Sequence, residues 1–197
     1  MKNLVIFLVV LGIIGGIALK YINAFPVLDE TVKEKWAQVQ NQYKRRADLI
    51  PNLVKTVQGY ASHEESVFKE VTEARSKATQ MTIDISSLDD PAKLKEFENA
   101  QKTLGGALSR LMAITENYPQ LKADQNFLSL QSQLEGTENR IAVARKDYIA
   151  AVKDYNIALR KIPGKFIAAM IYPELKPRVT FEASETEQSA PDVSFAK

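Results

Sequence analysis

The 197-residue chain has no cysteine, a single histidine, and only eight glycines and eight prolines. The missing cysteine excludes disulfides, thiolate metal sites and cysteine nucleophiles, and it leaves the redox compartment undecided. So few glycines and prolines argue against a turn-rich all-β protein. The formal net charge is only +2, with acids and bases interspersed. No basic face of the kind that binds nucleic acid is therefore indicated.

Residues that could perform chemistry are equally scarce. His63 lies beside Glu64 and Glu65, but no further ligands accompany it at helical spacing, which favours an exposed helical histidine over a metal site. The sequence shows no zinc-protease motif, no glycine-rich phosphate loop and no supported serine–histidine–aspartate set. We therefore predict a non-enzymatic protein with no cofactor and no metal.

What the sequence has instead is an apolar start. Residues 4–19 carry no charge, and as a helix they would cover about 24 Å of a hydrocarbon core about 30 Å thick. Tyr21 and Ile22, which follow Lys20, bring the span close to the length needed to cross a membrane if the Lys20 side chain snorkels to the surface. The sequence predicts a transmembrane helix over 1–22 that contacts lipid through 4–22.

A cleaved signal peptide is the alternative interpretation of this segment, because a basic start and a short apolar run look alike in both. No small-x-small cleavage site follows Leu19, which favours an uncleaved anchor. Gly12 and Gly16 form a small-xxx-small pair that could let two anchors pack closely. Lys2 on one flank and Lys20 on the other leave the sidedness undecided by charge.

From position 32 onward, apolar residues recur at alternating intervals of four and three. The first series is Val32, Trp36, Val39, Tyr43, Ile50, Leu53, Val57, Tyr60, Val67, Val71, Ala74 and Ala78. This 3.5-residue repeat indicates a coiled-coil-like seam. It predicts a single helix over about 29–80, about 75 Å long, which Pro51 should bend or divide in two.

Two further series follow a polar loop at 80–90. Asp90 and Pro91 resemble an N-cap and a first helical residue, and this second helix should end before Pro119. The third series begins after a plausible N-cap at Asp124 and ends at Pro163. The two series are Leu94, Phe97, Gln101, Leu104, Leu108, Leu111 and Thr115, then Phe127, Leu130, Leu134, Thr137, Ile141, Ala144, Tyr148, Ala151, Tyr155 and Ala158.

The predicted fold is therefore all-α. One N-terminal transmembrane helix precedes a long antiparallel helical bundle of three to four long helices over 23–172. Residues 165–172 form an apolar patch expected to add one or two turns against the bundle. Residues 173–197 read as an extended or partly disordered tail.

Two charged residues, Arg46 and Glu64, interrupt the first apolar series. Burying a lone charge is costly unless it is paired, and Glu138 and Arg140, beside Thr137 of the third series, are candidate partners. One interpretation is a polar layer that fixes the helix register; the other is a rod that projects into water at these positions. The candidate structural and interaction residues are Arg46, Pro51, Glu64, Thr137, Glu138, Arg140, Tyr148 and Tyr155.

Three long strings carry a resemblance to a known family. They are QYKRRADLIPNLVKTVQGYASHE at 42–64, ENYPQLKADQNFLSLQSQLEGTENRIAVARKDY at 116–148 and AVKDYN at 151–156. They resemble the LemA family of bacterial proteins, and the resemblance extends from about Tyr21 to Phe195. It implies a single membrane segment, a helical bundle and, for one relative, a role in magnetosome membrane formation. The patch IPGKFIAAMIYP departs from the family pattern.

Many family members carry a lipoprotein-type cysteine near the position of Ala24, which favours a bundle on the extracytoplasmic side of the bacterial membrane. We expect a membrane-anchored scaffold of the cell envelope that acts as a homo-oligomer or binds a protein partner. Off-seam apolar residues could cover a second surface: Leu49, Val54, Ile83, Ile167 and Met170. The alternative is a membrane-shaping protein whose bundle contacts lipid directly.

Overall fold

Helices make up all the regular structure of the computed structural model, which describes residues 1–84 and 87–181. The helices are α1 (Lys2–Gln58), α2 (Glu65–Gln80), α3 (Pro91–Thr115), α4 (Pro119–Lys122), α5 (Gln125–Arg160) and α6 (Gly164–Ile171). An all-α fold is thus confirmed for the described residues. Six helices of unequal length stand where we expected three to four long ones. Most of the predicted tail, 182–197, lies outside the described residues.

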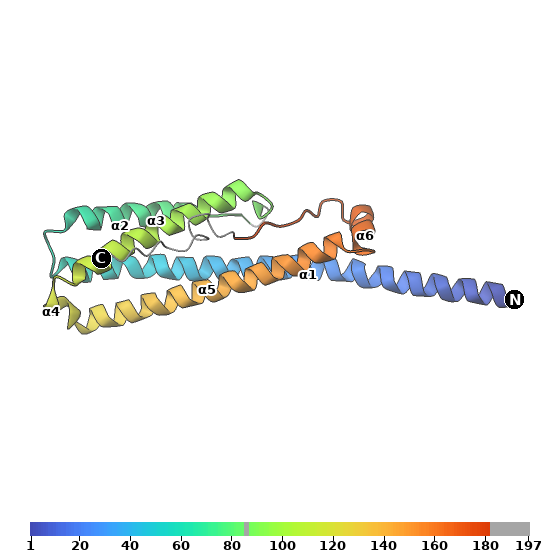
Figure 1. Cartoon of the computed structure of the whole chain (residues 1–197), viewed down its shortest axis with the longest axis horizontal. Helices are drawn as coiled ribbons and strands as arrows, with labels where there is room; N and C mark the ends of the chain where they lie inside the picture. The colour runs from blue at the N-terminus through green and yellow to red at the C-terminus, as the bar shows by residue number, and fades with distance from the viewer. Residues whose placement is uncertain (85–86, 182–197) are drawn as a thin grey trace, which may run out of the picture.

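The longest helix, α1, joins the apolar start of the chain to the packed helices without interruption (Figure 1). Its residues 2–17 are exposed, whereas Phe25, Val32 and Trp36 are fully buried. By length and composition, its start could cross a membrane. The boundary expected near residue 22, between the transmembrane helix and the bundle, therefore lies inside one continuous helix. It is the point where the exposed part of α1 passes into the packed part. We call the packed part, from Phe25 to Phe181, the body.

Two prolines lie inside α1, at positions 26 and 51. Proline has no N–H, so each leaves the carbonyl four residues earlier without its helical donor. The carbonyl of Ile22 instead accepts a hydrogen bond from the Tyr172 hydroxyl at 3.1 Å, and that of Ala47 accepts one from Arg75 Nε at 2.8 Å. Pro51 therefore does not divide the helix. Each proline marks a point where a later element bonds to α1.

The expected single helix over 29–80 is wrong. α1 ends at Gln58, residues 59–64 form a turn, and α2 runs back beside α1 (Figure 1). The apolar spacing continues through the turn because Ala61 is buried there with Val57 and Val71 in one cluster. Periodicity reports which residues are buried, so it could not reveal that the chain reverses.

The other helix boundaries follow their capping residues. The Asp90 carboxylate accepts a hydrogen bond from the backbone N–H of Ala92 at 2.9 Å, and Asp124 accepts one from Phe127 at 2.9 Å. Both predicted N-caps are confirmed. They satisfy N–H groups that the first turn of a helix leaves without partners.

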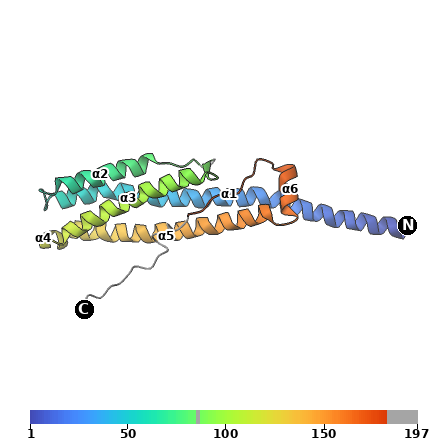
Figure 2. The same cartoon turned by 45° about the horizontal axis from the view of Figure 1, so that its top comes forward.

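The body contains two hydrophobic clusters along its length. α5 packs along α1, and α2 packs against α3 (Figure 2). The proximal cluster lies nearer the apolar start and includes Phe25, Trp36, Phe97, Tyr148 and Tyr155. The distal cluster includes Ile50, Leu53, Leu104, Leu111 and Phe127. α1 and α5 contribute to both clusters, so they connect the two halves.

Candidate functional site: a polar layer and a C-terminal strap

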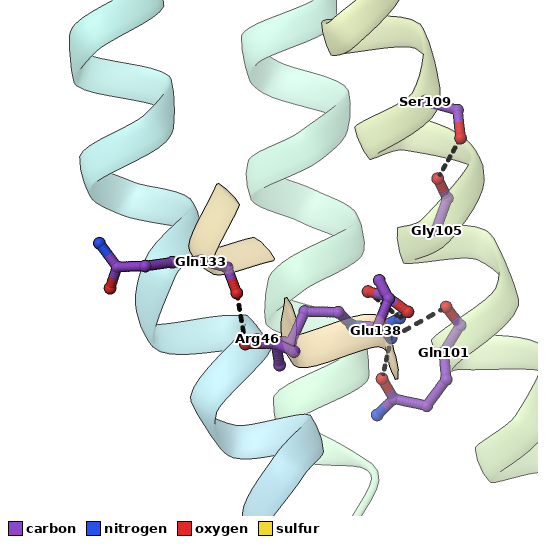
Figure 3. A network of polar contacts seen from close by, with 7 residues as sticks. Arg46, Gln101, Gly105, Ser109, Gln133 and Glu138 are labelled. Atoms are coloured by element: carbon purple, nitrogen blue, oxygen red, sulfur yellow. Dashed lines mark hydrogen bonds and ion pairs between the residues drawn. The ribbon is translucent and has the colours of Figure 1, made fainter. Parts of the chain in front are cut away.

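A layer of polar side chains lies in the body between the proximal and the distal cluster. We call it the polar layer, and it consists of Arg46, Gln101, Thr137 and Glu138. Arg46 of α1 is only 4% exposed. Its Nη1 donates to both carboxylate oxygens of Glu138 on α5, at 3.2 and 3.4 Å (Figure 3). Its Nη2 donates to the side-chain oxygen of Gln101 on α3 and, at 3.2 Å, to the Gln101 carbonyl. Four oxygen atoms of the protein thus accept hydrogen bonds from the guanidinium in place of water.

The layer reaches a fourth helix through Gln101. The side-chain amide of Gln101 donates to the carbonyl of Ala78 on α2 at 3.2 Å. Thr137 is fully buried and donates to Gln133 in its own helix at 2.7 Å. The Glu138 side chain remains 46% exposed, so its carboxylate keeps contact with water. Both terminal nitrogens of the Arg46 guanidinium are thus hydrogen-bonded, which offsets part of the cost of removing the charge from water. Its Nε has no hydrogen-bond partner among the described residues.

The remaining sequence candidates do not join this layer. Glu64 precedes α2 at its N-cap position and accepts a hydrogen bond from the Tyr118 hydroxyl at 3.3 Å. Arg140 is exposed on α5. Gly12 and Gly16 face open space, since a Cβ at either would meet nothing within 4 Å. The two charged interruptions of the first apolar series therefore have unrelated surroundings.

Tyr148 and Tyr155 belong to a second polar region, where the chain after α6 returns along the body. We call this extended segment, 172–181, the strap. The Tyr148 hydroxyl donates to the Val179 carbonyl at 3.0 Å. The Asn156 side chain bonds to both backbone groups of Arg178: it accepts a hydrogen bond from the N–H at 2.9 Å and donates one to the carbonyl at 2.8 Å. Part of the predicted tail, at Arg178 and Val179, is thus bonded to α5.

Aromatic contacts hold the far end of the strap. The ring of Phe181 lies 5.5 Å from Tyr148 and 6.0 Å from Trp36 between centroids. The central carbon of the Arg145 guanidinium lies 4.2 Å from the centroid of the Phe181 ring, within cation–π range. Residue spacing does not predict these contacts, because an extended segment has no helical period. The one sign of packing is the isolated phenylalanine at position 181, among mostly polar residues.

An ion pair joins the strap to α1. Arg178 Nη2 lies 3.0 Å from Asp29 Oδ1, and both side chains are 13% exposed. Lys33 Nζ lies 2.9 Å from the other carboxylate oxygen. Burial alone would raise the pKa of Asp29, but the hydrogen bonds and positive charges of Lys33 and Arg178 outweigh it and hold this pKa below its ordinary value. The carboxylate is therefore charged at neutral pH.

Burial raises the pKa of Tyr148 and of Tyr155, the two α5 tyrosines beside the strap. Among the described residues, no group of three or more histidine, cysteine or acidic side chains could hold a metal ion. The contacts of the polar layer and the strap are ion pairs, hydrogen bonds and aromatic contacts between segments of the chain.

A membrane-length apolar helix that continues into a body of packed helices defines a class of membrane-associated, all-helical proteins. The LemA family profile matches residues 35–195. This chain belongs to the LemA family, and the resemblance seen in its sequence is confirmed.

Named relatives agree with this membership. The chain is 29% identical to magnetosome protein MamQ 2 of Paramagnetospirillum magneticum over 175 residues, covering 81% of this chain and 64% of the relative. MamQ of Magnetospirillum gryphiswaldense is 29% identical over 162 residues, covering 74% and 60%. Protein LemA of Metamycoplasma hominis is 25% identical over 156 residues, covering 79% and 66%. The chain thus spans a little under two thirds of the length of these relatives, whose names denote no enzymatic reaction.

Proposed function

We propose that this protein is a membrane-anchored scaffold of the bacterial cell envelope that acts by self-association or by binding a protein partner, without catalysis. The observation that carries the proposal is the continuity of α1, which supplies both the apolar segment and the core residues Phe25 and Trp36. From Phe25 to Gln58 the helix extends about 50 Å. A body built on such a helix would stand at a defined angle to the membrane, as a scaffold requires.

Retention of the anchor is part of the proposal. Tyr21 and Ile22 contact later parts of the chain: Tyr21 lies against Gly164 and the Ile22 carbonyl binds Tyr172. Cleavage between 22 and 25 would remove both contacts together with the first part of α1. The intact mass of the protein extracted from membranes should therefore include the apolar segment, and a mature chain beginning after Leu19 would contradict this.

The polar layer would serve the scaffold by fixing the register of its helices. Arg46 finds its acceptors at one alignment of α1, α3 and α5. A shift by one helical turn would place its charge among apolar side chains, at a cost of several kcal/mol.

Self-association would use side chains that the body leaves uncovered. Val54 and Ile83 are buried within the two clusters, so they do not form the second surface suggested by the sequence. Four exposed apolar residues remain along α5: Leu128, Val143, Ile149 and Ile157. Their position on the longest helix of the body after α1 supports an association surface there.

Mass photometry of the detergent-extracted full chain tests this proposal. We expect particles larger than one chain, which the double substitution Val143→Asp and Ile149→Asp should reduce to monomers without loss of helical content. Arg140→Ala, on the same helix, is the matched control. A monodisperse monomer for the unmodified chain, without any co-purifying protein, would count against a scaffold.

Two observations support a second candidate function. The chain is similar to proteins named for the magnetosome, and an exposed apolar side of α6 lies beside the apolar start of α1. The protein would shape membrane by direct contact between its body and lipid. A chain lacking residues 1–20 would then float with liposomes, and its absence from the floating fraction would contradict this candidate.

We propose that the body lies on the extracytoplasmic side of the bacterial membrane; the lipoprotein-type cysteine that many family members carry near the position of Ala24 supports this side. Alkaline phosphatase fused after Lys197 should then be active. An inactive phosphatase fusion together with a fluorescent GFP fusion at the same residue would reverse the placement.

A further inference from the structure

We infer that α6 lies flat in the membrane–water interface beside the anchor, with Ile162, Phe166 and Met170 inserted into the leaflet that α1 enters. This inference rests on the proposed membrane anchor and on the second candidate function, and it deepens them by naming the helix, the side chains and the depth at which the body would meet lipid. The occupant is the bilayer itself, identified from the position, pattern and charge of the surface.

The pattern is an apolar face with no cover inside the chain. Ile162, Phe166 and Met170 follow one another at intervals of four, which places Phe166 and Met170 on one side of α6 and Ile162 just before it. They are 69%, 62% and 82% exposed, respectively. The opposite side, with Gly164 and Ala168, is buried against the body. Large apolar side chains so exposed and so close together indicate an interaction surface.

The position is fixed by close contacts with α1. A Cβ at Gly164 would lie 3.1 Å from the ring of Tyr21, and the Tyr172 hydroxyl binds the Ile22 carbonyl at 3.1 Å. The rings of Tyr172 and Phe25 are 6.1 Å apart. α6 is thus held beside residues 21–25, directly after the uncharged run that ends at Leu19.

The orientation suits a membrane surface. Figures 1 and 2 both show α6 lying across α1 at the point where the apolar part of α1 leaves the body. If α1 crosses a bilayer along its normal, α6 runs parallel to the bilayer plane at the level of the headgroups. Helices that lie in this plane bury an apolar face by about 5–10 Å.

The charge agrees with this position. Lys20 ends the apolar run on α1, and Arg160, Lys161 and Lys165 surround the start of α6; all four are exposed. Basic residues flanking an apolar face are typical of interfacial helices, because they attract anionic headgroups while their stems follow the apolar surface. Continuity with the anchor and positive charge together favour a lipid surface over a second copy of the chain.

Because the chain has no cysteine, single-cysteine variants can carry one environment-sensitive fluorophore each. We would label Phe166→Cys and Met170→Cys in the full chain, placed at one copy per nanodisc of mixed neutral and anionic phospholipid. Val143→Cys is the matched control, because Val143 is 58% exposed on α5 and one copy per nanodisc leaves the proposed association surface without a partner. Val10→Cys reports whether the anchor is inserted. Circular dichroism verifies that each variant retains its helices.

The readout is quenching by lipids that carry a spin label on the acyl chain, compared with quenching by iodide in water. We expect the lipid quencher to act at least about twofold more strongly at 166 and 170 than at 143, with iodide showing the reverse order. Iodide quenching at 166 and 170 equal to that at 143, with position 10 in lipid, would overturn the inference and leave the anchor intact. Probes shielded from both quenchers would also overturn it, because protein would then cover α6. A water-exposed position 10 would refute the anchor itself and the inference with it.

Discussion

The buried guanidinium of Arg46 depends on acceptors from two other helices, Glu138 and Gln101. Arg46→Ala should lower the free energy of unfolding by about 2–4 kcal/mol, because it empties buried space and leaves Gln101 without its donor. A double-mutant cycle with Glu138→Gln should give a coupling energy of about 1 kcal/mol. Chemical denaturation of the full chain in detergent measures both quantities.

An exposed pair of the same residue types provides the control. Arg110 lies 2.9 Å from Glu70, but its side chain is 66% exposed. Arg110→Ala should cost less than about 0.5 kcal/mol. Equal losses for the two arginines would show that the polar layer adds nothing beyond an ordinary surface ion pair.

The charge of Asp29 links the strap to pH. The pKa of Asp29 is lower in the folded chain than in the unfolded one, so its contribution to stability is complete above the unfolded value. That contribution is lost as pH falls through the lower folded value. Asp29→Asn should thus destabilise the protein by about 1–3 kcal/mol at neutral pH.

The difference between the two proteins should shrink as pH falls from about 5 to about 2. Thermal unfolding of both proteins across this range measures it. Glu30→Gln controls for the loss of a neighbouring charge, because Glu30 is exposed and contacts only Lys33 among the same groups. A constant difference between wild type and Asp29→Asn at every pH would contradict the linkage.

Sequence reasoning reached part of the site and missed the rest for a physical reason. A charge inside an apolar series must be paired or exposed, so Arg46 and its candidate partner Glu138 could be named in advance. Gln101 was identified as a polar residue within the second apolar series. Its pairing with Arg46 depends on how α1 and α3 are aligned, which the spacing of apolar residues does not predict. The contacts of Arg178 arise from an extended segment and carry no periodic signal.

At the scale of elements, the prolines of α1 exchange helical hydrogen bonds for contacts with other parts of the chain. Pro51→Ala would return an N–H to the Ala47 carbonyl, which now accepts from Arg75. Arg75→Leu should therefore cost about 1 kcal/mol in the natural sequence and distinctly less in the Pro51→Ala background. Denaturation of the four proteins of this cycle measures the difference. Additive losses would mean that the two donors do not compete.

Gly164 allows α6 to approach α1 and the end of α5. A Cβ there would lie 2.3 Å from the Ala158 carbonyl oxygen, so Gly164→Ala must displace α6. We expect faster proteolysis between 160 and 175 and a loss of about 1–3 kcal/mol. Gly136→Ala is the matched control, because a Cβ at Gly136 within α5 meets nothing within 4 Å. That substitution should stabilise the helix by about 0.5–1 kcal/mol.

Element boundaries were predictable where capping chemistry marks them. Asp90-Pro91 and Asp124 located the starts of α3 and α5 because their side chains satisfy free N–H groups. No comparable residue marks the reversal after Gln58, where the structure shows no side-chain cap on α2. Only Gly59, within an otherwise helical run, indicated that the helix ends there.

At the scale of the whole molecule, one helix transmits the orientation of the apolar segment to the body. Inserting Gly-Gly-Ser after Lys20 should break that connection while leaving the folded body unchanged. Spin labels at positions 143 and 10 would then show a broader distance distribution than in the natural chain. Inserting three alanines at the same place controls for added length. An equally narrow distribution with the glycine-containing insert would show that α1 does not orient the body.

The two proline-created acceptors also order the assembly of the chain in time. During synthesis α1 is made first, but the donor for Ala47 is made 28 residues later and the donor for Ile22 150 residues later. The Ile22 carbonyl, close to the apolar start of α1, therefore gains its partner in the folded chain only after Tyr172 has been made. A chain shortened before this tyrosine would lack the bond to Ile22, although it would still contain Arg75, the partner of Ala47.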